Sequence, residues 1–377
     1  MNTSHQIINA NSIDKMREMK DNSVDLIFAD PPYWMRVSGV LHRTEGTVYR
    51  GCNDEWDNKF KSLKDYLRFT REWLTECRRI LKPDGSIWVI GSMQCIFSIG
   101  CIMQELGFWI INDVVWQKTN PTPNFMGTRL NNSHETLIWA AKDKGSKYTF
   151  HYKTAKELNV DNVSDREFRD GVRKQLGSVW KIPVCTGGER LKNEEGTKLH
   201  STQKPEELLY RVICISSDPG DLVFDPFGGT MTTGAVAKRT GRSFIGIEAN
   251  PVYCDYGRKR LEGVQQQMGD IETASFDNTP NKIRFAEMLD HGYVSPGDVF
   301  YTKDKSVRAV LQDDGRLLFD NGTVADIHQG AAQALNSRAH RLNGFSVWHV
   351  VRDDSLISID EIRSKFSALP NASATSA

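Results

Sequence analysis

Short apolar runs alternate with segments of helical periodicity along much of the first 250 residues of the chain. Apolar residues that recur every three or four positions predict helices, and unbroken apolar runs of four to eight residues predict buried strands. The predicted strands are His5–Ala10, Val24–Ala29, Ser86–Gly91, Trp109–Trp116, Glu135–Ala141, Leu222–Pro226 and Phe244–Glu248, and the predicted helices are Ser12–Met19, Leu63–Leu81, Ile96–Leu106, Pro205–Ser216 and Thr232–Arg239. Strands that alternate with helices in this way predict an α/β fold, with a mostly parallel sheet covered by helices on both faces.

The pattern changes at three places, and each change predicts a boundary. Residues 151–199 are polar and weakly periodic, which indicates an insertion in a catalytic domain of residues 1–263. Residues 264–281 have the composition of a linker. Residues 282–366 regain apolar content and predict a small second domain with strands at Asp298–Thr302, Ala309–Leu311 and Phe345–Val351. A disordered tail is predicted for residues 367–377.

Composition excludes some classes of protein without naming a function. The 48 basic and 48 acidic residues give no net charge, which argues against a protein that merely coats nucleic acid. No apolar run is long enough to span a bilayer and the N-terminus lacks a signal-peptide pattern, so a cytoplasmic protein without membrane contact is expected. The seven cysteines form no CxxC pair, so neither a metal site nor a disulfide framework is expected.

A candidate for catalysis lies where the strand VDLIFA runs into Asp30-Pro31-Pro32-Tyr33. Two prolines cannot continue a sheet ladder, so the chain turns there and exposes its polar groups. An exocyclic base amine is a poor nucleophile because its lone pair is delocalised into the ring. The Asp30 carboxylate and the Pro31 carbonyl could each accept one N–H of such an amine and free the lone pair, while Tyr33 offers a ring for a flipped base. The alternative is a simple strand-ending turn, which Asp and Pro also favour.

A candidate for ligand binding follows the strand Leu222–Pro226. The glycine-rich segment Phe227–Gly234 lies between this strand and a helix start, where a ligand can approach the backbone closely. The strand SFIGIE ends about 20 residues later in Glu248, the position at which dinucleotide folds place an acidic residue on ribose hydroxyls. A nicotinamide cofactor is disfavoured because the GxGxxG spacing is absent. A tight turn without a ligand is the alternative.

The pairing of FADPPYW with the later FDPFGGTMTTG resembles the β-class amino-methyltransferases, in which the catalytic motif precedes the cofactor motif. The segments LKPDGSIWVIGS, FWIINDVVWQKTNPTPNFMGTR, HETLIWAAK and HSTQKPEELLYRVI resemble the cell-cycle-regulated adenine methyltransferases and the related type II enzymes that read GANTC. Residues Ile283–Val351, with NGFSVWHV, resemble the small C-terminal domain, a restriction-enzyme-adenine-methylase-associated domain, that is often attached to them.

The resemblance implies a Rossmann-like S-adenosylmethionine-dependent methyltransferase fold that methylates the N6 amine of a flipped adenine in DNA. It implies that Asp30, Pro31, Pro32 and Tyr33 receive the base. It assigns S-adenosylmethionine to Asn11, Asp30, Thr202, Gln203, Lys204, Asp225, Phe227, Gly229, Thr232 and Glu248. DNA is the implied partner, and a homodimer is left open.

Two residues depart from the family pattern. Met231 stands at the last glycine of the usual FxGxGTT, so a positive φ there would cost energy and weaken cofactor binding. Gly228 is a candidate to compensate by moving the flexible point upstream. Trp34 stands where the relatives often have Asn, and it either adds to the base pocket or fills space beside it.

DNA contacts are predicted in two loops and on the second domain. Trp34, Arg36 and Arg43 belong to a loop that either wedges into the base stack or packs on its own domain. Asn120, Asn124 and Arg129 lie in a second loop and have groups suited to base edges, although such residues are often only solvated. Lys303, Lys305, Arg308, Arg338, His340 and Arg341 predict a basic face, with ordinary surface charge as the alternative.

Two other functions compete with adenine methylation. Cytosine-N4 methylation uses the same scaffold, but Asp rather than Ser before Pro-Pro-Tyr favours adenine. A catalytically silent DNA-binding protein on the same scaffold would be compatible with the unusual Met231.

Overall fold

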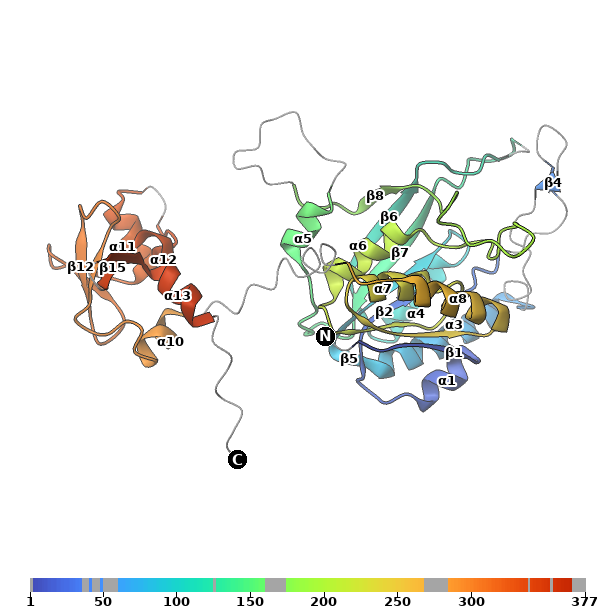
Figure 1. The fold of residues 1–377 in the computed structure, drawn as a ribbon, viewed down its shortest axis with the longest axis horizontal. Helices are drawn as coiled ribbons and strands as arrows, with labels where there is room; N and C mark the ends of the chain where they lie inside the picture. Colours follow the sequence, from blue (N-terminus) through green and yellow to red (C-terminus); the bar gives the residue numbers. More distant parts are fainter. Residues whose placement is uncertain are drawn as a thin grey trace. The chain divides into compact units, whose positions relative to one another are not determined.

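An eight-stranded sheet organises the first of two units, Met1–Asp277 and Asn278–Ala377. The structure is a computed structural model, and it describes residues 3–35, 41–42, 48–49, 60–124, 127–159, 174–267, 284–337, 340–352 and 355–367. Figure 1 shows the fold of both units, with many of their helices and strands labelled.

Most neighbours in the large sheet are parallel, as the sequence predicts. Only β7 (His134–Ala141) runs antiparallel to both of its neighbours, β5 (Leu81–Gly91) and β6 (Trp109–Lys118). In spatial order the strands are β1 (His5–Asn9), β10 (Ser243–Glu248), β9 (Leu222–Asp225), β2 (Val24–Ala29), β5 (Leu81–Gly91), β7 (His134–Ala141), β6 (Trp109–Lys118) and β8 (Val179–Ile182). A separate two-stranded antiparallel sheet consists of β3 (Leu41–His42) and β4 (Val48–Tyr49).

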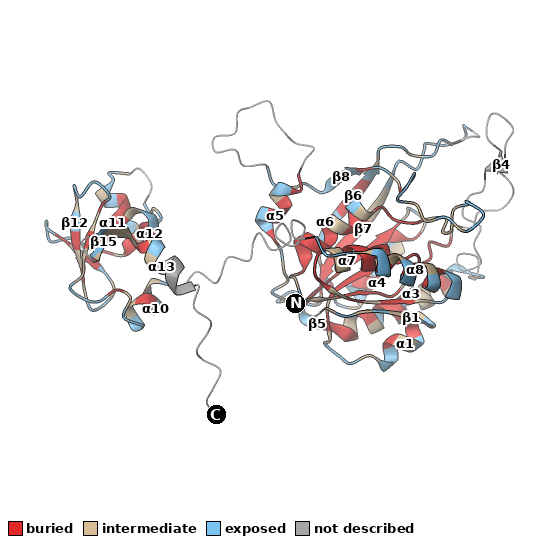
Figure 2. Ribbon diagram, in the orientation of Figure 1, coloured by how far each residue is buried: buried red, intermediate tan, exposed pale blue. Residues whose placement is uncertain are grey.

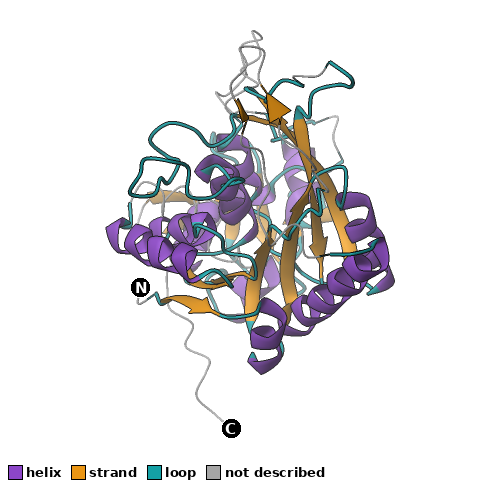
Figure 3. Cartoon of the chain, turned by 90° about the vertical axis from the view of Figure 1, so that its right-hand side faces the viewer, coloured by secondary structure: helices purple, strands orange, loops and turns teal. Residues whose placement is uncertain are grey.

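Helices cover both faces of the large sheet, as Figure 3 shows. One face packs against α1 (Ser12–Glu18), α3 (Leu63–Ile80) and α4 (Ile96–Glu105). The other packs against α5 (Tyr152–Glu157), α6 (Glu206–Ser216), α7 (Thr232–Arg239) and α8 (Pro251–Gly263). The predicted Rossmann-like α/β architecture is therefore confirmed.

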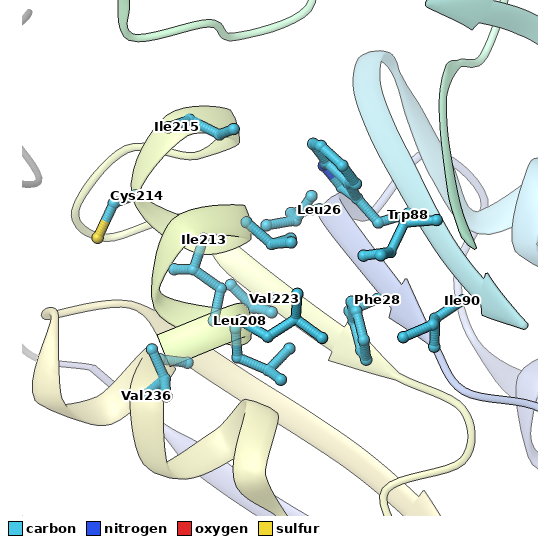
Figure 4. Packing of buried hydrophobic residues seen from close by; sticks show 14 of the residues in the cluster. Leu26, Phe28, Trp88, Ile90, Leu208, Ile213, Cys214, Ile215, Val223 and Val236 are labelled. Atoms are coloured by element: carbon cyan, nitrogen blue, oxygen red, sulfur yellow. The ribbon is translucent and has the colours of Figure 1, made fainter. Parts of the chain in front are cut away.

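The central strand β2 is buried on both faces, which explains its unbroken apolar sequence. Leu26 and Phe28 pack toward α6 and α7, whereas Ile27 and Ala29 pack toward α1 and α3, because successive side chains point to opposite faces. Figure 4 shows Leu26 and Phe28 among the buried side chains that pack between the sheet and the helices α6 and α7. Figure 2 shows how the buried residues follow the strands and the inner sides of the helices.

The sequence Pro83-Asp84-Gly85 is typical of a turn that closes the helix before it, but α3 ends at Ile80 and β5 begins directly at Leu81. The segment lies within β5, where Val24 of β2 pairs with Leu81 and Leu26 already pairs with Ser86, so that residues 82–85 form a bulge. Gly85 is needed there, because a Cβ atom would come within 2.9 Å of the Asp25 carbonyl oxygen.

The segment 151–199, predicted to be an insertion, supplies parts of the catalytic unit where it is described. Its strand β8 pairs with β6 at the edge of the sheet. Trp180 of β8 is buried and lies 5.8 Å from Trp88 of β5 between ring centroids. This strand was missed because four residues with alternating burial carry little periodic signal.

The second unit is built on an antiparallel six-stranded sheet. The strand order is β14 (Val324–Ala325), β13 (Leu317–Phe319), β12 (Arg308–Leu311), β11 (Val299–Tyr301), β15 (His349–Arg352) and β16 (Ser355–Ser358). Its helices are α10 (Phe285–Asp290), α11 (Ile327–Ala334), α12 (Gly344–Val347) and α13 (Ile359–Ser367). This small α+β unit was also predicted.

The predicted strand Phe345–Val351 is wrong in its first half, because Gly344–Val347 forms α12. The Asn343 side chain accepts a hydrogen bond from the Phe345 amide and so caps the helix. Gly344 also permits a close approach that no larger residue allows, since a Cβ atom there would lie 2.3 Å from the Ile327 carbonyl oxygen.

Among the described residues, no helix combines the length and the apolar character that crossing a membrane requires.

Trp348 holds the second unit together. Its ring is fully buried, packs edge-on against Phe300 and Phe319, and donates a hydrogen bond to the Ile327 carbonyl at 2.9 Å. We expect Trp348→Ala to destabilise this unit by about 3–5 kcal/mol, since it removes a buried ring and leaves a cavity. Calorimetry should then show loss of the second unit's unfolding transition with that of the first unit unchanged. A variant with a wild-type calorimetric profile would contradict this assignment of the core.

Candidate active site at the carboxyl edge of the sheet

Four parallel strands lie side by side, and each delivers a polar residue to the same edge of the sheet. Asn11 follows β1, Glu248 ends β10, Asp225 ends β9 and Asp30 follows β2. Because parallel strands share the edge at which they end, these side chains line one pocket.

All the residues that the sequence assigns to the base or to the cofactor line this pocket. They are Asn11, Asp30, Pro31, Pro32, Tyr33, Thr202, Gln203, Lys204, Asp225, Phe227, Gly229, Thr232 and Glu248. The structure therefore brings together five stretches that are separate in the sequence: Asn11, residues 30–33, residues 202–204, residues 225–232 and Glu248.

The carboxylate of Asp30 forms a buried ion pair with Lys204. The Lys204 ammonium lies 2.8 Å from Asp30 Oδ2, and only 6% of the Lys204 side chain is exposed. Burial raises the pKa of Asp30 above its usual value, and the nearby ammonium opposes this rise. The lysine thus stabilises a carboxylate that the pocket would otherwise tend to protonate.

Two residues absent from the sequence assignment complete this cluster. Glu135 at the start of β7 accepts a hydrogen bond from the Tyr33 hydroxyl at 2.8 Å, and its carboxylate lies 3.7 Å from the Lys204 ammonium. Lys118 at the end of β6 pairs with Glu135 at 2.7 Å. The Lys204 ammonium also lies 5.0 Å from the centre of the Tyr33 ring, a cation–π distance.

Aromatic residues pack against the turn that follows β2 and hold it in place. Tyr66 of α3 donates a hydrogen bond to the Pro32 carbonyl at 3.0 Å. Trp34 stacks on Tyr66 with ring centroids 5.7 Å apart and donates to the Phe60 carbonyl. Trp34 is buried, so in this structure it fills space under the turn and is not exposed for wedging into DNA. Its φ of 50° is unusual for a large side chain, and the surrounding contacts hold it there.

Asp225 organises the glycine-rich loop. One carboxylate oxygen accepts a hydrogen bond from the Phe227 amide at 2.9 Å, and the other accepts one from the Thr233 hydroxyl at 2.5 Å. Burial raises the pKa of Asp225 to about 7, although these hydrogen bonds oppose the rise. Phe227 packs edge-on against Trp73, which fixes the start of the loop.

Glu248 links the loop to the neighbouring strand. Its two oxygens accept hydrogen bonds from the Gly229 amide at 2.9 Å and the Asn250 amide at 2.7 Å. Burial raises its pKa above the usual value. A carboxylate has about four acceptor positions, so Glu248 retains capacity for ligand hydroxyl groups. Asn11 caps α1 by accepting from the Ile13 and Asp14 amides, which holds it at the pocket.

The residues before α6 hold the opposite side of the pocket. Gln203 is buried, donates to the Glu189 carbonyl at 2.9 Å and accepts from the Leu191 amide at 3.0 Å. The Thr202 amide donates a hydrogen bond to Nδ1 of His200 at 3.2 Å, which helps to fix the conformation of Thr202. Gln203 therefore ties the segment 189–191 to the pocket wall.

Met231 has the left-handed conformation that its place in the glycine motif predicts, with φ of 59°. Its side chain is fully buried in a space that three glycines leave open. A Cβ atom at Gly228 or Gly246 would lie 2.6 or 2.8 Å from Met231 Sδ, and one at Gly257 would lie 2.5 Å from Met231 Cγ. Gly228 therefore makes room for the side chain, whereas the positive φ before Met231 belongs to Gly229.

The charges of the pocket suit a cationic ligand. Asp30, Asp225 and Glu248 are acidic, and burial raises the pKa of each. Of the described residues that line the pocket, Lys204 alone is a lysine or arginine. A ligand with a sulfonium and an ammonium group would relieve the desolvation of these carboxylates. The residues present thus fit S-adenosylmethionine.

The residues predicted to contact DNA are placed less clearly. Asn120 accepts from the Val184 amide at 2.8 Å and so ties its loop to the segment after β8. Asn124 donates to the Arg129 carbonyl at 3.0 Å within its own loop. Arg129 is exposed. Arg36 and Arg43 lie outside the described residues.

The predicted basic face of the second unit is partly neutralised. Arg308 pairs with Asp320 at 3.0 Å and Arg341 with Asp326 at 3.3 Å, whereas Arg338 lies outside the described residues. Lys303, Lys305 and His340 are exposed. Across the described part of the chain, no group of three His, Cys, Asp or Glu side chains is arranged to hold a metal ion.

Comparisons with known proteins agree with this geometry. The family profile described as DNA methylase matches residues 24–259, and that described as Restriction Enzyme Adenine Methylase Associated matches residues 265–368. Type II methyltransferase M.HinfI of Haemophilus influenzae is 45% identical over 361 residues, which cover 96% of each chain. Type II methyltransferase M2.DpnII of Streptococcus pneumoniae is 40% identical over 257 residues, which cover 68% of this chain and 89% of the relative.

A solved structure shows the same fold. It is the PvuII DNA methyltransferase, titled cytosine-N4-specific, with a TM-score of 0.51 and 19% identity. The match covers 73% of this chain and 93% of that chain.

Met231 tests the balance between backbone strain and packing. Met231→Gly relieves a strain of roughly 1 kcal/mol but loses about 2–5 kcal/mol of buried packing, so we expect a less stable protein. Met231→Ala keeps the strain and loses the packing, so it should be less stable still. Denaturant unfolding of the three proteins measures both differences. A glycine variant more stable than the wild type would contradict the packing role.

The raised pKa of Asp225 predicts a pH effect on the ligand-free protein. In the unfolded chain this carboxyl ionises near its ordinary pKa of 3.8, whereas in the folded state it ionises near 7. Stability should therefore fall as the pH rises from 3.8 to about 7, because ionisation favours the unfolded chain. Asp225→Asn should lack this part of the fall. If the free energy of unfolding fell equally with pH in the wild type and in Asp225→Asn, Asp225 would not be the cause of the fall.

Proposed function

The chain belongs to the DNA methylase family, and we propose on that basis that it transfers a methyl group from S-adenosylmethionine to the N6 amine of adenine in DNA. It is a DNA methyltransferase, and S-adenosylmethionine is its cofactor. The observation that carries the proposal is the shared pocket, in which Asp30 lies beside the glycine-rich loop and Glu248.

S-adenosylmethionine, when bound, supplies a methyl group on a positively charged sulfur. Glu248 would hold its ribose, and Asp225 with the loop from Phe227 to Thr232 would hold its methionine end, beside the Asp30 turn. The residues that would hold the methyl donor and those that would hold the base amine lie at the ends of the adjacent strands β9 and β2. Proximity and alignment of the two reactants contribute much of the acceleration.

Asp30 and Pro31 would receive the two N–H groups of the adenine amine. Tyr66 already occupies the Pro32 carbonyl, whereas no described residue donates a hydrogen bond to that of Pro31. Two acceptors on one nitrogen favour a tetrahedral arrangement, which frees the lone pair for attack. After transfer the amine carries an extra proton, and Asp30, whose pKa is raised by burial, is placed to accept it.

The aromatic ring of Tyr33 would stack on the flipped base. Its hydroxyl is anchored on Glu135, so the ring is held in place before DNA binds. We propose that further residues contact the DNA around the flipped base. They are Asn120, Asn124 and Arg129 on one loop, and Arg36 and Arg43, which lie outside the described residues.

Adenine is favoured over cytosine by two features. Asp precedes Pro-Pro-Tyr, and the second unit matches a profile described as adenine-methylase-associated. The sequence segments that resemble the GANTC enzymes support GANTC as the recognition site, and on the same resemblance we propose a relation to the cell-cycle-regulated class. We also propose that the protein acts in the cytoplasm on chromosomal, plasmid or phage DNA. Assembly as a homodimer is part of the same proposal.

Loss of the Asp30 carboxylate should abolish methylation. We expect Asp30→Ala to reduce methyl incorporation into plasmid DNA by about 100-fold or more, because it removes an acceptor that the transition state requires. Digestion of the product DNA to nucleosides should yield N6-methyl-2′-deoxyadenosine from the wild type. The matched control is Asp25→Asn, an ion-paired aspartate on the same strand that does not line the pocket. Substantial turnover by Asp30→Ala, or N4-methylcytosine in the product, would refute the proposal.

A further inference from the structure

Glu135 lies at the active edge of the sheet because β7 runs opposite to its neighbours. The start of β7 pairs with the end of β5, where Thr136 faces Gly91, and with the end of β6, where His134 faces Gln117. A residue at the start of this strand therefore reaches the edge at which the parallel strands end.

The Glu135 carboxylate bridges three groups of the site. It accepts the Tyr33 hydroxyl at 2.8 Å, lies 2.7 Å from the Lys118 ammonium, and lies 3.7 Å from the Lys204 ammonium that holds Asp30 at 2.8 Å. Only 12% of its side chain is exposed. It does not line the pocket, so it acts on the base and the methyl group only through Tyr33 and Lys204.

The two carboxylates share Lys204, so their charges are coupled. The ammonium is closer to Asp30, and Lys118 compensates Glu135 from its other side. Burial raises the pKa of Glu135, but the ammonium groups of Lys204 and Lys118 and the Tyr33 hydrogen bond together hold it below its usual range. The titratable and charged groups that face this cluster are Asp30, Tyr33, Cys95, Lys118, Lys204 and Asp225.

We propose that Glu135 is a positioning residue of the methyl-transfer reaction, which fixes the Tyr33 ring and shares Lys204 with Asp30 through its ionised carboxylate. This inference rests on the proposed function. A neutral residue at this place would leave Lys204 to Asp30 alone and weaken the anchor of the ring. The ammonium would then hold the Asp30 carboxylate more firmly, in competition with the base amine.

Glu135→Gln tests the charge with little change in shape. We expect the single-turnover rate of methyl transfer to fall roughly 10-fold to 100-fold, as for a displaced reacting group, with the Kd for S-adenosylmethionine unchanged. The acidic limb of the rate against pH should move to lower pH, because the negative charge of Glu135 raises the pKa of Asp30. Glu76→Gln is the matched control, since Glu76 is a half-buried glutamate paired with Arg79 on α3 and lies outside the pocket. It should retain the wild-type rate and pH profile.

Lys118→Gln supplies a test with the opposite sign. Without Lys118, Glu135 attracts Lys204 more strongly and Asp30 loses part of its partner, so the acidic limb should move to higher pH. Shifts in opposite directions support the proposal, because a merely structural role would move neither limb. A wild-type rate and profile in Glu135→Gln, or shifts of the same sign in both variants, would overturn it. If the wild type itself methylates no adenine, the proposed function fails instead.

Discussion

The buried ion pair between Asp30 and Lys204 is the interaction on which the site depends. A carboxylate in an apolar pocket tends to take up a proton, and a protonated Asp30 could not accept the hydrogen bond of an amine. The ammonium at 2.8 Å favours the charged form. Because burying one charge alone costs several kcal/mol, the two residues have to be placed together. The segment before α6 is therefore as much part of the site as the turn after β2.

The sheet provides that placement. Four parallel strands end side by side, and their ends carry the turn Asp30–Tyr33 and the glycine-rich loop. The acidic residues Asp225 and Glu248 lie on either side of this loop. The antiparallel β7 adds Glu135 from the opposite chain direction. Met231 stands where the family motif has a glycine, and its side chain fits because Gly228, Gly246 and Gly257 leave space for it. The unusual loop is thus built into the core and gives no support to a catalytically silent protein.

Much of this was predictable from the sequence, because the pattern of strands and helices is strong and the motifs lie at strand ends. Asp30, Asp225 and Glu248 were identified in this way. Glu135 and Lys118 were missed, since nothing local shows that β7 is antiparallel, although a charged residue at the start of the apolar run HETLIWAA was a usable signal. Tyr66 and Trp73 lie on the buried face of α3, and only their packing shows that they support the site. The helix α12 was mistaken for a strand because its four residues are too few to show a period.

The crystal structure of this protein with S-adenosylhomocysteine and a DNA duplex that contains the target adenine tests the central claim most directly. We expect a flipped adenine stacked on Tyr33, with its N6 atom within hydrogen-bond distance of the Asp30 carboxylate and the Pro31 carbonyl. We also expect Lys204 to remain paired with Asp30. An adenine bound away from Asp30, or an Asp30 carboxylate turned away from the base toward Lys204 alone, would contradict this claim.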